Sequence, residues 1–120
     1  MSDEFIKVAT EEINEEIASI KKILDKCNND SNVFENSSLI EKHIHKIKGL
    51  APMMGKESIG EIAFLNDALL SQILDGKHLE GIYSILYESN LFMEQSMNNT
   101  ASDSKELKQK IETKYSKYLD

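Results

Sequence analysis

Hydrophobic residues recur at three- and four-residue spacing along almost the whole chain, which is the period of an amphipathic α-helix. No stretch alternates polar and apolar residues in the way a half-buried strand does. The pattern therefore predicts an all-α protein. The first predicted helix runs from about Asp3 to Lys26, and its apolar positions are Ile6, Ala9, Ile13, Ile17, Ile20 and Leu24.

Residues with turn chemistry separate the first helix from the second. The stretch 27–36 (CNNDSNVFEN) is rich in turn-forming residues and lacks helical periodicity, so we expect a loop there. Ser37 or Ser38 can cap the next helix, and Glu41 stands where the partner of Ser38 in a capping box would stand. The apolar face of this second helix consists of Ile40, Ile44, Ile47 and Ala51.

Pro52 sets the expected end of the second helix, because proline lacks the backbone donor and crowds the preceding turn. The helix should end or kink within residues 50–54. A third helix, with Ser58 as a possible cap, should extend to about Leu74, where a turn follows at 75–77. Its inward-facing positions are Ile62, Leu65 or Leu69, Leu70 and Ile73.

Two more helices are expected in the C-terminal part of the chain. The fourth runs from about Leu79 to Met97, and the pattern breaks at 98–102. The fourth helix uses Ile82, Ile85, Leu86, Phe92 and Met93. The fifth, Asp103 to Leu119, carries a narrow apolar stripe formed by Leu107, Ile111, Tyr115 and Leu119.

Helix lengths and short connections together predict an architecture. Four helices joined by short loops favour an antiparallel four-helix bundle, with the fifth helix packed beside it. At 120 residues the chain has room for one domain, 1–120, with the bundle at about 3–97 and the fifth helix at about 103–119.

Charge and composition narrow the possible functions. The formal net charge of −7 argues against nucleic-acid binding, which requires basic surface. All 14 basic residues are lysine, so no arginine can clamp a phosphate. We find no apolar run long enough to span a membrane. The N-terminus is acidic, unlike that of a signal peptide. The single Cys27 cannot form an intrachain disulfide, and we expect a cytoplasmic protein that does not bind membranes.

The candidate chemistry lies in residues 43–55, HIHKIKGLAPMMG. On a helix, Lys48 and Gly49 share a face with His45, whereas His43 points elsewhere because it is two residues away. A phosphoryl acceptor needs an exposed neutral imidazole, and Lys48 could offset the charge of a bound phosphoryl group. Gly49 provides clearance for a partner although glycine costs about 1 kcal/mol inside a helix.

Other chemistries are disfavoured. His43 and His45 lack the i, i+3 or i, i+4 spacing of helical metal chelation, and His78 is distant, so we expect neither a metal site nor a cofactor. We find no glycine-rich phosphate loop, no kinase nucleotide motif and no plausible Ser/His/Asp grouping. The chain is therefore expected not to be an enzyme, and another protein must supply the phosphoryl group.

The stretch resembles the histidine phosphotransfer (HPt) family, closest to the N-terminal phosphotransfer domain of chemotaxis histidine kinases. The family pattern is His-x-x-Lys-Gly, then small residues, then a glycine ten positions after the histidine. Here these positions are filled by His45, Lys48, Gly49, Ala51 and Gly55. The specific part of the resemblance covers residues 40–70.

The resemblance implies a four-helix bundle with the active histidine exposed on the second helix, and a fifth helix in chemotaxis-type members. It also implies an acid on the third helix that orients the imidazole. Family members have a glutamate there, and this chain has Asp67. Three residues earlier they have a histidine, and this chain has Phe64.

Two functional hypotheses follow. In the first, His45 is the phosphoacceptor, Lys48 stabilises the phosphoryl charge, Gly49 gives clearance and Asp67 orients the ring. The expected partners are a histidine kinase catalytic domain and a response-regulator receiver domain. In the second, the departures at Phe64 and Asp67 indicate a non-phosphorylated module that docks on a receiver or kinase and regulates it. A generic helical adaptor is the third reading, and the chain could be free-standing or part of a larger kinase.

Overall fold

The structure is a computed structural model that describes residues 2–99 and 103–119. Over these residues the chain is all-α, which confirms the predicted fold class. The helices are α1 (Asp3–Asp25), α2 (Asp30–Glu35), α3 (Ser37–Met53), α4 (Glu57–Leu74), α5 (Ile82–Asn98), α6 (Lys105–Lys114) and the short 3₁₀ helix η1 (Ser116–Tyr118).

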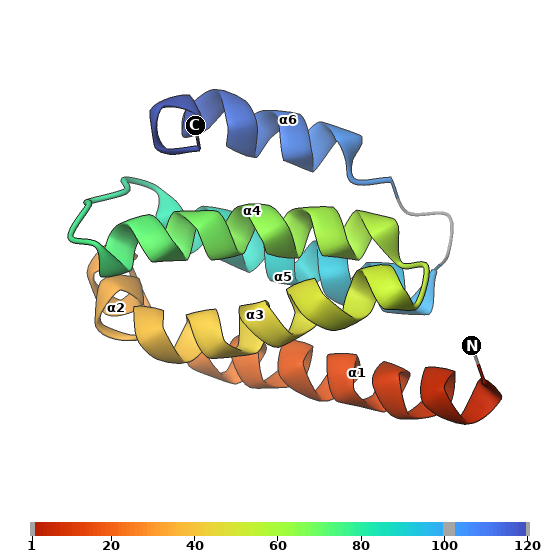
Figure 1. Ribbon diagram of the computed structural model, residues 1–120. Helices are drawn as coiled ribbons and strands as arrows, with labels where there is room; N and C mark the ends of the chain where they lie inside the picture. Colours follow the sequence, from red (N-terminus) through yellow and green to blue (C-terminus); the bar gives the residue numbers. More distant parts are fainter. Residues whose placement is uncertain (1, 100–102, 120) are drawn as a thin grey trace.

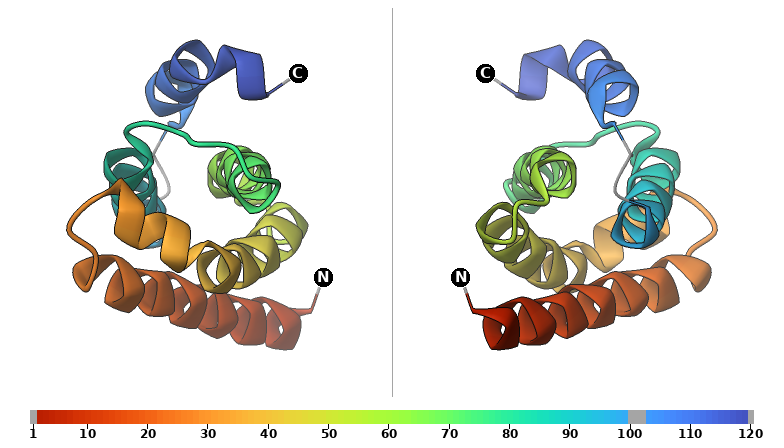
Figure 2. Two further views of the ribbon diagram at one scale, coloured as in Figure 1. Left: turned by 90° about the vertical axis from the view of Figure 1, so that its left-hand side faces the viewer. Right: turned by 90° about the vertical axis from the view of Figure 1, so that its right-hand side faces the viewer.

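The four longest helices surround a common apolar core. α3 packs against α1 and α4, and α5 packs against the same two helices (Figure 1). Viewed from the ends, α6 lies outside this group and packs mainly against α4 (Figure 2). The fully buried side chains are mostly isoleucine and leucine from these helices, including Ile13, Ile20, Ile40, Ile44, Ile47, Ile62, Leu69 and Leu70. Burying such side chains contributes roughly 1.5–3 kcal/mol each.

The end of α3 follows from its proline, as predicted. Pro52 lies in the last turn of the helix, which ends at Met53. Gly55 then adopts a φ of 76°, a left-handed conformation that favours glycine and turns the chain toward α4. A Cβ on Gly60 of α4 would lie 2.9 Å from Cγ of Pro52, so the absence of a side chain there lets α4 approach α3.

The expected loop at 27–36 is wrong in part, because it contains the short helix α2. Asn29 caps this helix by accepting a hydrogen bond from the backbone N–H of Asn32. The carboxylate of Asp30 accepts hydrogen bonds from the backbone N–H groups of Gly81 and Tyr83, both at 2.8 Å. A helix of six residues is too short to show periodicity, so the sequence pattern could not reveal it.

Both predicted serine caps are wrong. α3 begins at Ser37 directly after α2, with Asn36 in the cap position and no side-chain cap hydrogen bond. The Ser37 hydroxyl donates instead to the carbonyl of Val33, because the two helices follow one another almost without interruption. At α4, Lys56 rather than Ser58 occupies the cap position.

Several predicted boundaries and inward-facing positions also need correction. Ile6 is 41% exposed because the first turns of α1 project beyond the neighbouring helices (Figure 1). α5 begins at Ile82 instead of Leu79, because Gly81 has a φ of 84° and interrupts the helical backbone. Phe92 is only partly buried. Of the expected break at 98–102, residues 100–102 lie outside the described part of the chain.

The last predicted helix is shorter than expected and is held by one buried tyrosine. α6 ends at Lys114, and η1 follows Tyr115. The Tyr115 hydroxyl donates to the carbonyl of Glu80 at 2.7 Å, and burial raises its pKa to about 12. Leu107, Ile111 and Tyr115 of the predicted stripe are buried, whereas its last member, Leu119, lies beyond α6 and is only partly buried. This segment is therefore anchored on the rest of the fold.

Across residues 2–99 and 103–119, none of the helices combines the length and apolar character needed to cross a membrane.

Candidate functional site

His45 lies in the middle of α3 on the side that faces away from the core. The core-facing positions on either side of it, Ile44 and Ile47, are buried. A residue between them on a 3.6-residue helix must point outward. The His45 side chain is 64% exposed, so an incoming molecule can reach it.

The structure brings His45, Lys48 and Asp67 together. Nδ1 of His45 lies 3.5 Å from Oδ2 of Asp67, which reaches across from α4. The Lys48 ammonium donates to the same Oδ2 at 2.6 Å. Because Nδ1 faces Asp67, the other ring nitrogen, Nε2, is the one left for a molecule that approaches from solvent.

Glu41 also belongs to this cluster, although the sequence analysis assigned it to a cap. Its Oε2 lies 3.7 Å from Nδ1 of His45, one helical turn away on α3. The i, i+4 spacing of Glu41 and His45 was the signal that could have identified it.

The pKa values of the two carboxyl groups in the cluster, Glu41 and Asp67, shift in opposite directions. A hydrogen bond to Asp67, together with burial, raises the pKa of Glu41. For Asp67, burial opposes ionisation, but hydrogen bonds to Glu41 and Lys48 and the charge of Lys48 outweigh it and lower its pKa. Asp67 is therefore the stronger acid of the pair.

Gly49 lies one turn after His45 on the exposed side of α3. A Cβ built on this residue would meet no atom of residues 2–99 or 103–119 within 4 Å, so no contact with these residues requires a glycine here. This contrasts with Gly60, whose position is fixed by Pro52.

Phe64 lies beside Lys48 and is exposed. The Lys48 ammonium is 5.9 Å from the centre of the Phe64 ring, and Phe64 is 60% exposed. A groove between α4 and α6 includes this ring and is lined by Pro52, Glu57, Gly60, Glu61, Phe64, Leu65, Lys108 and Glu112. The face next to His45 is thus partly apolar.

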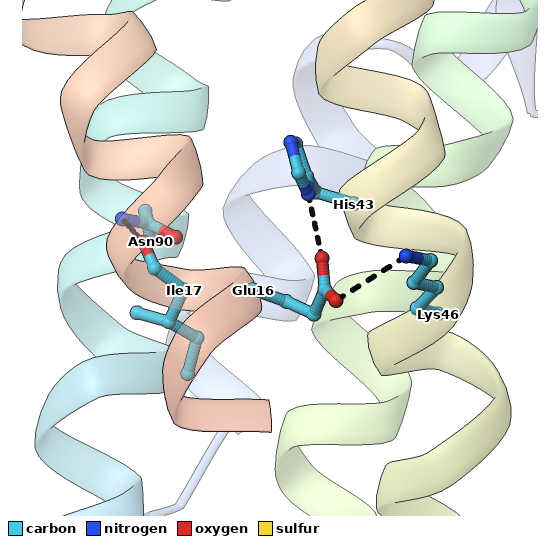
Figure 3. A network of polar contacts seen from close by, with 5 residues as sticks. All are labelled: Glu16, Ile17, His43, Lys46 and Asn90. Carbon is cyan, nitrogen blue, oxygen red and sulfur yellow. Dashed lines mark hydrogen bonds and ion pairs between the residues drawn. The ribbon is translucent and has the colours of Figure 1, made fainter. Parts of the chain in front are cut away.

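His43 is placed apart from the cluster, as its spacing predicted. Its Nδ1–H donates to Oε1 of Glu16 on α1 at 2.6 Å (Figure 3). Lys46 reaches the other oxygen of Glu16 at 3.5 Å, so one carboxylate joins two residues of α3 (Figure 3). The Glu16 side chain is only 8% exposed, and the sequence analysis missed it because it flanks the apolar face of α1.

The geometry around His45 suits nucleophilic chemistry at Nε2. A carboxylate near Nδ1 favours the tautomer that keeps the proton on Nδ1 and leaves a lone pair on Nε2. The separation of 3.5 Å is longer than a good N–H···O hydrogen bond of about 2.7–3.2 Å, so the ring must turn slightly to close the contact.

Searches of the chain against protein-family models, curated proteins and solved structures find no match.

Proposed function

We propose that this chain is a histidine phosphotransfer (HPt) module of a two-component phosphorelay of the chemotaxis type. It carries a phosphoryl group on His45 between a histidine kinase and the aspartate of a response-regulator receiver domain. The proposal rests above all on one observation: an exposed imidazole has its Nδ1 turned toward a buried carboxylate, with a lysine one turn away on the same face. In this proposal α1, α3, α4 and α5 are the bundle, α6 is the fifth helix, and the protein works in the cytoplasm.

The transfer step is an in-line displacement at phosphorus. The Nε2 lone pair of His45 attacks the phosphoryl group of the donor, a P–N bond forms, and the P–O bond to the donor's leaving group breaks. The leaving group is the carboxylate of a receiver aspartate or the ADP of a kinase-bound ATP. In the onward step, a receiver carboxylate attacks phosphorus, and the electron pair of the P–N bond returns to Nε2.

Asp67 and Lys48 support this step from the side of Nδ1. The Asp67 carboxylate stabilises the positive charge that develops on the ring as Nε2 attacks. Lys48 is bonded to Asp67 before transfer, and its flexible side chain can then turn toward the phosphoryl oxygens. A lysine is a point charge and can make this change without the planar geometry that an arginine would require.

A partner protein must come very close to Nε2 for the reaction to occur. Gly49 leaves the surface open one turn after His45, and the exposed ring of Phe64 offers an apolar contact on the neighbouring helix. Because this chain lacks a nucleotide-binding motif, both the donor and the acceptor sites belong to its partners.

The same face supports a second candidate function, regulation by docking alone. This function is favoured by the exposed Phe64, which stands where members of the HPt family have a histidine and which lines the groove between α4 and α6. Such a module would bind a receiver or kinase and never accept a phosphoryl group.

Phosphorylation by a small donor separates the two candidates without knowledge of the natural partner. The chain is incubated with potassium phosphoramidate, and the phosphoryl adduct is measured by intact mass and by its lability in acid and stability in base. We expect a single adduct on the wild type and on the His43→Gln variant, and none on His45→Gln.

A receiver domain carrying labelled phosphate serves as the protein donor in a parallel assay with the same variants. An adduct that persists in His45→Gln would overturn the carrier proposal. If no donor labels the wild type while the receiver still binds it, the docking function is the correct one.

A further inference from the structure

The cluster around His45 also has the composition of a metal site. Three potential ligand atoms, one each from Glu41, His45 and Asp67, lie within 4.8 Å of one another among the described residues. They come from two helices, α3 and α4, which fix their positions. One neutral imidazole and two ionised carboxylates would balance the charge of a divalent ion.

The two distances from His45 to the carboxylates fit metal ligation better than they fit hydrogen bonding. A tetrahedral Zn²⁺ site has bonds of about 2.0–2.2 Å, which places neighbouring ligand atoms about 3.4 Å apart. Nδ1 of His45 lies 3.5 Å from Oδ2 of Asp67 and 3.7 Å from Oε2 of Glu41. Both separations exceed the roughly 2.7–3.2 Å of a good hydrogen bond, yet both need to shrink by only a few tenths of an ångström to hold a metal ion.

A buried atom without a partner points to the same conclusion. The Asp67 side chain is 9% exposed, and its Oδ1 has no hydrogen-bond partner. A buried carboxylate oxygen in this state is costly unless a donor or a cation satisfies it.

We propose that Glu41, His45 and Asp67 bind Zn²⁺ in the resting protein, with water as the fourth ligand. Lys48 competes with the ion, because its ammonium occupies Oδ2 of Asp67 at 2.6 Å. Its side chain is partly exposed, so it can turn into solvent when the ion binds.

Metal binding would regulate the proposed phosphotransfer, and this consequence rests on the proposed function. An ion on Nδ1 displaces the proton from that nitrogen and leaves Nε2 protonated, without a lone pair for phosphorus. Zn²⁺ is therefore expected to slow phosphorylation of His45. The binding itself can be measured whether or not His45 accepts a phosphoryl group.

Calorimetric titration of the intact chain with ZnCl₂, in a buffer that does not chelate metals, tests the site. We expect one equivalent to bind, and affinity to fall at least about tenfold in His45→Gln, Asp67→Asn and Glu41→Gln. Lys48→Gln removes the competing cation and should tighten binding by about threefold to tenfold. Mg²⁺, which prefers six oxygen ligands, should bind far more weakly.

Controls keep the site identifiable. His43→Gln and Glu61→Gln change a histidine on the same helix and a carboxylate on α4, both outside the cluster, and should leave the Zn²⁺ affinity unchanged. His45 is exposed, so its variant is expected to fold, which circular dichroism checks. Absence of binding to the wild type, unchanged affinity in His45→Gln, or equal affinity for Mg²⁺ would each overturn the proposal.

Discussion

Two histidines on α3 stand two residues apart and have opposite surroundings. His43 faces α1 and holds a carboxylate at 2.6 Å, and its side chain is 22% exposed. His45 faces outward, is 64% exposed, and has carboxylates only at 3.5 and 3.7 Å. The helical rotation of about 100° per residue turns a difference of two positions into this contrast.

The comparison shows what separates a structural histidine from a reactive one. His43 donates its Nδ1–H to Glu16 in a short hydrogen bond that joins α1 to α3, and Lys46 forms an ion pair with the same carboxylate (Figure 3). Around His45 the same residue types, a carboxylate and a lysine, bond mainly to each other. The imidazole is thus left accessible beside a pair that can rearrange.

Substitution of Lys48 and of Lys46 gives the largest expected difference between the two clusters. Lys48→Gln should lower the rate of phosphorylation of His45 by about tenfold to a hundredfold, because it removes the charge that offsets the phosphoryl group. Lys46→Gln, the matched change on the His43 side, should leave the rate within about twofold, because Lys46 pairs with Glu16 and not with the cluster around His45. Initial rates with phosphoramidate measure both. Equal rates for the two variants would contradict the role assigned to Lys48.

The buried carboxylate of the other cluster should matter for stability instead. Glu16→Ala leaves His43 and Lys46 without their partner and should lower the free energy of unfolding by about 1–2 kcal/mol. Glu16→Gln retains a hydrogen-bonding side chain and should recover part of the loss. Urea denaturation measures the change, and Glu88→Ala, which removes an exposed ion pair with Lys110, is the control. If the Glu16→Ala variant is folded but phosphorylation of its His45 is slowed, the separation of the two clusters into a structural one and a reactive one is wrong.

Two helical glycines sharpen the argument about access. Gly49→Ala should raise the free energy of unfolding by about 0.5–1 kcal/mol, because the new methyl group meets no atom and alanine favours a helix. Gly60→Ala should lower it by about 1–3 kcal/mol, since its Cβ would press on Pro52.

Gly49→Ala also distinguishes an effect on partner access from an effect on the reactivity of His45. Gly49→Ala should slow transfer from a phosphorylated receiver while its reaction with phosphoramidate stays unchanged. If transfer from the receiver is also unchanged, Gly49 does not serve partner access.

Much of the fold could be predicted because burial follows the helical period. The long helices and the end of α3 at Pro52 follow from repeated Ile and Leu and from one missing backbone donor. α2 could not be predicted, because it is six residues long and its Asp30 is held by backbone N–H groups more than fifty positions away. The serine cap predicted for α3 failed because α2 runs almost directly into α3.

The candidate site could be predicted only along α3. His45, Lys48 and Gly49 are local in sequence, so their common face follows from helix geometry alone. Asp67 came from the resemblance, since nothing in the spacing says which residue of α4 faces His45. Glu41 was visible at i, i+4 but was read as a cap, and the pairing of Glu16 with His43 depends on how α1 packs against α3.

The position of the phosphoryl group tests the central claim most directly. After reaction of the wild-type chain with phosphoramidate, NMR correlation of ³¹P with the imidazole protons and ¹⁵N nuclei identifies the phosphorylated nitrogen. The account predicts a single phosphoramidate at Nε2 of His45, with the proton on Nδ1 facing Asp67. A phosphoryl group on His43 or His78, or at Nδ1 of His45, would contradict it.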